Sequence, residues 1–68
     1  MQNFKIKEEY IHLNQLLKAL GWCENGGDAN AAIENSKVKV NGETENRKRN
    51  KIRIGDRVEF NGNKVEVE

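Results

Sequence analysis

The 68-residue chain has no proline, one cysteine and one histidine. The lone Cys23 cannot form an intramolecular disulfide, and a small domain without crosslinks fits a reducing compartment, where such a cysteine is typically a buried small hydrophobe. With His12 as the only histidine, the chain holds too few ligands for a usual zinc site. No apolar run approaches the roughly 20 residues of a membrane span, and no signal-peptide core follows Met1. We therefore expect a cytoplasmic protein with no metal, no other cofactor and no membrane partner.

Length also limits what the chain can do. A chain of this size buries only about 60% of its unfolded surface, so its core stabilises it by only ~3–5 kcal/mol, and we expect a single domain over 1–68. Nucleophiles exist at Cys23, Ser36 and Thr44, but no arrangement of serine, histidine and acid, and no carboxylate pair in an apolar pocket, follows from the pattern. The sequence predicts a protein that binds rather than an enzyme.

The formal net charge of +1 hides an uneven distribution. Residues 1–36 hold three lysines and five acids, residues 37–57 hold eight lysines or arginines and three acids, and residues 58–68 hold one lysine and three acids. A basic segment between acidic ends creates a local field that attracts an anion such as a phosphate backbone. The alternative is a solvated strand face whose lysines protect a sheet edge from aggregation. Charge alone leaves both open.

Apolar spacing predicts two helices after a short strand. Phe4 and Ile6 alternate with lysines, which indicates a first strand that pairs with one of the last strands. The first helix has a leucine stripe and ends near Gly21, and the second begins at Asn25, with Asp28 completing a capping box. The apolar positions are Leu13, Leu16, Leu17 and Leu20 in the first helix, and Ala29, Ala32 and Ile33 in the second.

Beyond Ser36 the apolar residues alternate with polar ones, as in half-buried strands. Turns are expected at Asn41-Gly42, Gly55-Asp56 and Asn61-Gly62. Two helices followed by a small antiparallel sheet make an α+β domain. The residues expected to face inward are Val38, Val40, Ile52, Ile54, Val58, Phe60, Val65 and Val67.

The ordered set of motifs from about Ile11 to Phe60 resembles the S4 (S-four) RNA-binding domain, named after a ribosomal small-subunit protein. The similarity is greatest to its stand-alone bacterial branch, which has an acid-x-Arg-basic-x-x-Lys hairpin. The motifs are the leucine-rich helix, the glycine turn before Ala29 and Ile33, Val38-x-Val40-Asn41-Gly42, Glu45-Asn46-Arg47-Lys48-Arg49-Asn50-Lys51 and Gly55-Asp56.

The resemblance implies a helix pair on a small, strongly bent antiparallel sheet, the αL motif. It also implies a monomer that binds structured RNA, such as ribosomal or transfer RNA, and that associates with the ribosome or an assembly intermediate. Carried over by position, the RNA contacts are Lys18, Asn25, Gly26, Gly27, Lys37, Lys39, Arg47, Lys48, Arg49 and Lys51.

Two positions depart from the family pattern. Asn30 stands where many relatives have lysine or arginine, which removes a charge from the expected RNA face. Ser36 stands where relatives usually have glycine, so either Ser36 or Asn35 must take the left-handed conformation.

The residues themselves support the same function and leave some roles open. Arg47 and Arg49 can clamp phosphates with planar forks, whereas Gly26-Gly27 is either an anion-binding helix start or a flexible helix entrance. Trp22 is expected to plug the core rather than stack on a base.

Tyr10 and His12 are expected to cap or pack at the first helix, and contact of either with a ribose is the alternative. Because the sequence shows no platform of exposed aromatics, recognition should depend on RNA shape and phosphate positions more than on reading base edges. A small protein–protein interaction module remains the alternative function. A ubiquitin-like carrier would need a Gly-Gly tail, whereas this sequence ends in Val65-Glu66-Val67-Glu68.

Overall fold

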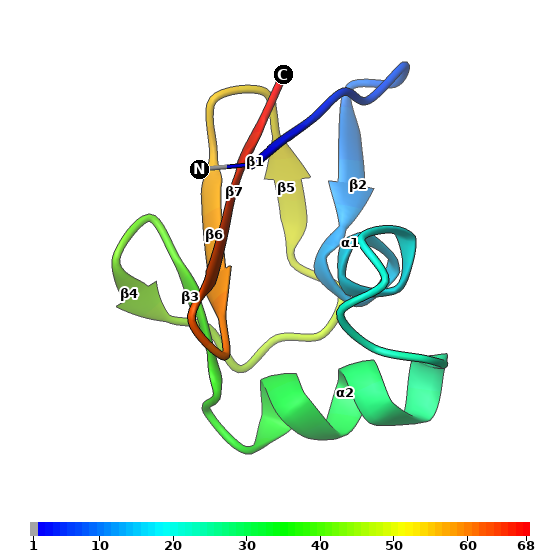
Figure 1. Cartoon of the computed structure of the whole chain (residues 1–68), viewed down its shortest axis with the longest axis vertical. Coiled ribbons are helices and arrows are strands. Elements are labelled where there is room, and N and C mark those ends of the chain that lie inside the picture. The colour runs from blue at the N-terminus through cyan, green and yellow to red at the C-terminus, as the bar shows by residue number, and fades with distance from the viewer. Residues whose placement is uncertain (1) are drawn as a thin grey trace.

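The computed structural model describes residues 2–68 and contains two helices and seven short strands. Figure 1 shows the second helix at the lower end of the molecule, the first helix at mid-height, and most of the strands above the second helix. The predicted α+β class is confirmed. In chain order the elements are β1 (Gln2–Phe4), β2 (Tyr10–His12), α1 (Leu13–Ala19), α2 (Gly26–Glu34), β3 (Val38–Val40), β4 (Glu43–Thr44), β5 (Lys51–Arg53), β6 (Arg57–Phe60) and β7 (Asn63–Val67).

The strands form two sheets rather than one. A five-stranded sheet has the order β1-β7-β6-β3-β4, and β2 pairs with β5 in a separate two-stranded sheet. The first strand pairs with the last, as predicted, but it runs parallel to it, so the larger sheet is mixed and not wholly antiparallel. A parallel pair needs a long crossover connection, and here nearly the whole chain separates the two strands.

The core lies between the helices and the inner faces of the sheets. Cys23 is buried as predicted, and Trp22 is half-buried and packs against the core from its edge. Ile54 does not face inward. It lies in the turn after β5, where Gly55 has a φ of 95°, and its side chain is 65% exposed. The side chains buried most completely are Leu13, Leu16, Leu17, Ile33, Val38, Ile52, Val58, Val65 and Val67.

The predicted turns and helix ends follow local chemistry. Both residues of Asn41-Gly42 and of Asn61-Gly62 have positive φ, the type I′ pattern that matches the twist of paired strands. Gly21 has a φ of +75° just after α1. Asn25 caps α2 by accepting a bond from the Asp28 N–H at 2.9 Å, which is the first half of the predicted capping box.

Strand β2 was not predicted, because three residues leading directly into a helix give too short an alternation to detect. It pairs antiparallel with β5, and Ile11 lies opposite Ile52. His12 is the N-cap of α1 but makes no side-chain capping bond. The free N–H groups of α1 are therefore satisfied from elsewhere in the chain.

Candidate nucleic-acid interface

Residues 45–50, which we call the basic loop, connect β4 to β5 and so pass from one sheet to the other. The sequence predicted a hairpin here, and that prediction is wrong: the flanking strands pair with β3 and β2 and not with each other. Figure 1 shows the loop crossing the space between the two sheets, close to both helices.

One end of the basic loop caps helix α1. The Leu13 N–H donates to the Asn50 carbonyl at 2.9 Å, and the Asn14 N–H donates to the Lys48 carbonyl at 3.0 Å. These two bonds satisfy first-turn N–H groups that have no partner inside the helix. The loop backbone thus takes over the capping role that the His12 side chain does not fill.

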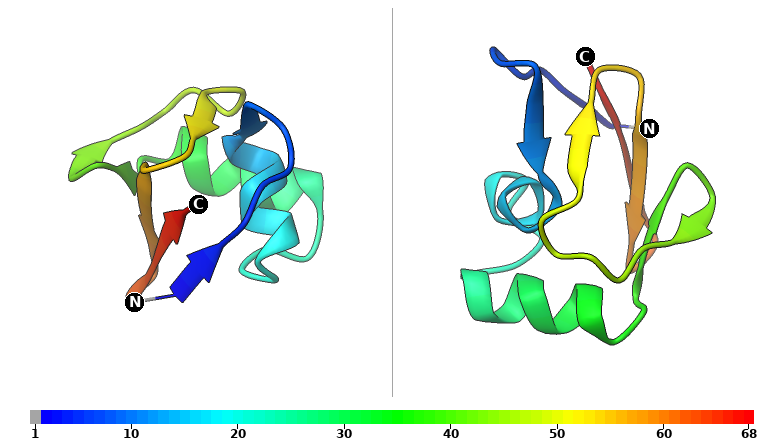
Figure 2. Two further views of the ribbon diagram at one scale, coloured as in Figure 1. Left: turned by 90° about the horizontal axis from the view of Figure 1, so that it is seen from above. Right: turned by 180° about the vertical axis from the view of Figure 1, so that it is seen from behind.

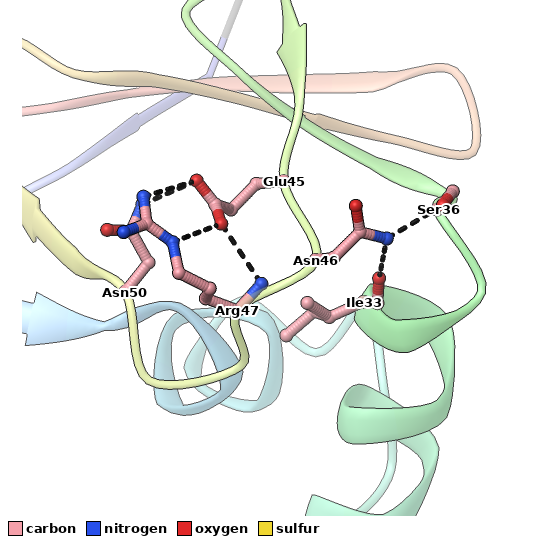
Figure 3. Close-up of polar contacts among 6 residues, drawn as sticks. All are labelled: Ile33, Ser36, Glu45, Asn46, Arg47 and Asn50. Carbon is pink, nitrogen blue, oxygen red and sulfur yellow. Dashed lines mark hydrogen bonds and ion pairs between the residues drawn. The ribbon is translucent and has the colours of Figure 1, made fainter.

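The other end of the basic loop is tied to the end of helix α2. Asn46 Nδ2 donates to the Ile33 carbonyl at 3.3 Å and to Ser36 Oγ at 2.7 Å (Figure 3). Ser36 itself takes the left-handed conformation, with a φ of 61°, whereas Asn35 stays at −89°. The serine that replaces the usual glycine therefore provides a hydrogen-bond acceptor for the loop that glycine would lack.

Glu45 organises the interior of the loop. Its carboxylate accepts bonds from the Arg47 backbone N–H at 3.0 Å, from Arg47 Nε at 2.9 Å and from Arg47 Nη2 at 3.2 Å. Asn50 Nδ2 donates to the same carboxylate at 3.3 Å, as Figure 3 shows. The side-chain bond from Arg47 is the main cause that holds the pKa of Glu45 below its ordinary value.

The cations of the loop remain open to solvent. The Arg47 side chain is 78% exposed despite its pairing with Glu45. Lys48 Nζ lies 3.7 Å from Glu34 Oε2 at the end of α2, in an exposed pair that adds little stability. Arg49 is exposed and has no ion-pair partner among residues 2–68. The loop therefore presents positive charge on a backbone fixed at both ends.

A second group of predicted residues lies where α1 ends and α2 begins. Lys18 is in the last turn of α1, and its Nζ is 3.9 Å from the position that a Cβ on Gly26 would take. Asn25 uses its side-chain oxygen as the cap of α2, and a Cβ on Gly27 would come within 3.3 Å of that oxygen. Lys18 thus adds a positive charge beside the start of α2.

The two strand-side lysines have different positions. Lys37 is exposed in the connection from α2 to β3, directly after Ser36 and therefore close to the anchor of the basic loop. Lys39 lies on β3 between the buried Val38 and the partly buried Val40, so its side chain projects from the opposite, outer face of the sheet. There its cross-strand neighbours are Glu59 and Thr44. The Lys37 backbone follows the Ser36 anchor and Lys39 faces Glu59 across the strands, but both lysines line one shallow groove on the outer side of the sheet.

Asn30, the other departure from the family pattern, makes a side-chain hydrogen bond. Its Oδ1 accepts a bond from Asn14 Nδ2 at 3.0 Å, which links α1 to α2. The helix pair is therefore fixed by a polar bond at the position where relatives often have a cation.

Residues 2–68 contain neither a membrane-spanning helix nor a cluster of metal-ligating side chains. Neither of their helices is long and apolar enough to cross a membrane. Over the same residues, no group of three or more His, Cys, Asp or Glu side chains is placed to hold a metal ion.

The fold and this face define a class of protein: a small α+β domain in which a helix pair and two small sheets support a basic surface. Residues 4–68 match the family model described as S4 domain, so the chain belongs to the S4 domain family. The resemblance seen in the sequence is confirmed.

Two related proteins come from Escherichia coli and Shigella flexneri. The chain is 46% identical over 61 residues to "Putative RNA-binding protein YbcJ" of Escherichia coli (strain K12), covering 90% of this chain and 87% of the relative. A YbcJ protein of Shigella flexneri gives the same values. The solution structure of YbcJ from E. coli, described as revealing an αL motif involved in RNA binding, superimposes with a TM-score of 0.75 at 44% identity. That match covers 98% of this chain and 86% of the other.

Proposed function

We propose that this domain binds structured RNA through the basic loop and the adjoining helix ends, without catalysing a reaction. The observation that carries the proposal is the anchoring of the loop, whose backbone is hydrogen-bonded to the start of α1 and, through Asn46, to the end of α2. A phosphate-binding loop held in place loses less conformational freedom on binding than a mobile one. Its exposed arginines and lysines are suited to phosphate contacts.

The proposed RNA face contains most of the contacts predicted from the sequence. Arg47, Lys48, Arg49 and Lys51 provide the charge near the start of α1, and Lys37 adds to it beside the Ser36 anchor. Lys18 and residues 25–27 extend the face along the helix pair. The names given to the YbcJ relatives point to the same class of ligand.

The specific target that we propose is ribosomal RNA or a ribosome assembly intermediate. We also propose that the protein binds it as a monomer in the cytoplasm. This step depends on analogy with the S4 family, because a fold does not by itself fix a target. Crosslinking the protein to RNA in cells and sequencing the bound fragments tests it directly. Fragments spread over messenger RNA, with none enriched from ribosomal RNA, would reject this target and leave RNA binding intact.

RNA binding itself is tested with two double variants that remove equal charge. Lys48→Gln with Arg49→Gln alters the basic loop, whereas Arg57→Gln with Lys64→Gln alters ion pairs on the larger sheet. We expect the first variant to weaken binding to a structured RNA by about tenfold or more in a gel-shift titration, and the second to stay near wild type. Equal losses would mean that total charge and not the loop determines binding. Retained affinity in the loop variant would place the site elsewhere.

A further inference from the structure

The two-stranded sheet carries an aromatic and basic surface that the sequence did not reveal. In the β2–β5 register, Tyr10 lies opposite Arg53 and His12 lies opposite Lys51. The middle pair faces the core, because Ile52 is fully buried and Ile11 packs against the buried cluster. Side chains alternate along a strand, so the flanking four residues share the outer face. We call this surface the β2–β5 platform, made of Tyr10, His12, Lys51 and Arg53.

Its rings and cations are in contact. The ring centroids of Tyr10 and His12 are 5.4 Å apart, with an interplanar angle of 35°. Lys51 Nζ lies 4.9 Å from the centroid of the Tyr10 ring, within the range of a cation–π contact. Tyr10 nevertheless remains 37% exposed and is one of the few large apolar side chains that face solvent in residues 2–68. The platform is thus ordered and still accessible.

A groove runs beside the platform. It has a volume of about 710 Å³ and is lined by Tyr10 and His12, by the segment that follows β1, and by one side of α1. Three lysines line it, namely Lys5, Lys7 and Lys18, against the single acid Glu8. Rings on one wall and ammonium groups around them provide both contacts that a nucleotide needs: a surface for the base and charge for its phosphate.

We propose that the β2–β5 platform and its groove bind an unpaired nucleotide of the RNA, with the base stacked on Tyr10 and His12. The base takes the place of the Lys51 ammonium group over the Tyr10 ring. Lys51 and Arg53 then contact the phosphates on either side of that base. The proposal rests on the proposed function and adds to it the class of RNA element that is recognised. It also adds base stacking to the expectation from sequence that recognition depends on RNA shape and phosphate positions more than on reading base edges.

The platform adjoins the basic loop in the chain and in space. Strand β5 begins where the loop ends, and α1, whose start the loop caps, follows directly from β2. In the right-hand view of Figure 2, β2 and β5 stand side by side above α1, and the loop passes below them. When an RNA stem contacts the basic loop of the protein, the unpaired nucleotides next to that stem therefore lie within reach of the platform. A bulged or looped stem provides such nucleotides.

The alternative is that these contacts only stabilise the small sheet, and two RNAs separate the possibilities. One is a stem-loop with four unpaired uridines, and the other is the same stem as a blunt duplex. Tyr10→Leu removes the ring and keeps an apolar side chain, and Tyr10→Phe keeps the ring as a matched control. Stacking predicts that Tyr10→Leu weakens stem-loop binding about tenfold, leaves duplex binding unchanged and differs from Tyr10→Phe, which stays near wild type.

A second measurement uses the wild-type protein alone, so it does not depend on how the variants fold. Tyr10 and His12 are the only tyrosine and the only histidine, so their ring protons give unambiguous NMR signals. We expect both sets to shift on adding the stem-loop and to stay in place with the duplex. Ring signals that do not shift, or a Tyr10→Leu variant that loses equal affinity for the two RNAs, would overturn the platform. The proposed function would still stand in that case, provided that the wild type binds the duplex. Failure of the wild type to bind either RNA would overturn both.

Discussion

Glu45 and Arg47 form a two-point ion pair across a single intervening residue, with Nε donating to Oε2 at 2.9 Å and Nη2 donating to Oε1 at 3.2 Å. The pair lies inside the basic loop and is joined there by Asn50. It fixes the turn that carries the exposed cations. The single negatively charged side chain of Glu45 thus helps to order a positively charged surface.

Glu45→Gln is therefore expected to lower the melting temperature at pH 7, since the neutral amide loses the charge-assisted bonds. The folded-state pKa of Glu45 is lowered, so its contribution is present above the ordinary value of 4.5 and is lost as pH falls through the lowered pKa. The melting-temperature difference between wild type and variant should accordingly shrink below pH 4.5. Thermal melts at several pH values measure it.

A charge-matched control is Glu8→Gln, in the segment between β1 and β2. No hydrogen bond or ion pair is made by the Glu8 side chain within residues 2–68, so its loss should barely change the melting temperature at pH 7. If the Glu45 difference persisted unchanged at pH 3, the ionised carboxylate would not be what holds the loop.

A single substitution in the core should have a larger effect on stability. Leu17 in α1 is fully buried among the other leucines and the sheet valines. Leu17→Ala should cost about 2–5 kcal/mol, which is comparable to the whole stability of a domain of this size. Circular dichroism at 25 °C should show a largely unfolded chain. A cooperative melt close to that of the wild type would mean that α1 is not packed as the structure has it.

The sequence predicted the parts of this fold that local chemistry determines. The leucine stripe located α1, Asn25 located the start of α2, and the two Asn-Gly pairs located tight turns, because each signal lies within a few residues. The sequence did not predict that β1 pairs parallel to β7, since the direction of pairing depends on the path of the whole chain. The prediction that Ile54 faces inward was wrong for a related reason. The alternation of apolar and polar residues continues in the sequence past the point where the chain turns at Gly55.

In the candidate site, too, the sequence predicted the local features and missed the contacts between distant residues. The cations of the basic loop were visible as a run of charge, whereas the bonds that anchor them join residues up to 37 positions apart, as from Leu13 to Asn50. The platform was missed because β2 was not recognised. Tyr10-Ile11-His12 and Lys51-Ile52-Arg53 share one alternation around a buried isoleucine, and that shared pattern was the available signal.

The two glycine positions beside the helices should respond in opposite ways to the same change. Gly21 has a φ of +75°, so Gly21→Ala should destabilise the domain by about 1–2 kcal/mol. Gly26 is in the first turn of α2, where a Cβ meets only Lys18 Nζ at 3.9 Å, so Gly26→Ala should stabilise it by about 0.4–1 kcal/mol. Urea unfolding measures both. If Gly26 allows close approach of RNA, the stabilised variant should also bind less tightly.

Salt dependence tests how far the RNA face extends. If the face neutralises about four phosphates, log affinity against log salt should slope at roughly −3 to −4, with ~0.7–0.9 per phosphate. Lys48→Gln should reduce that magnitude by a little under one unit and weaken different RNAs equally, because a phosphate contact carries no sequence information.

Lys39→Gln removes the same charge from the outer face of the sheet, beside Glu59, and should leave the slope unchanged. Filter binding at several salt concentrations measures all three proteins. A reduced slope for Lys39→Gln would extend the face around the sheet edge, and a flat response in the wild type would remove the phosphate-binding surface altogether.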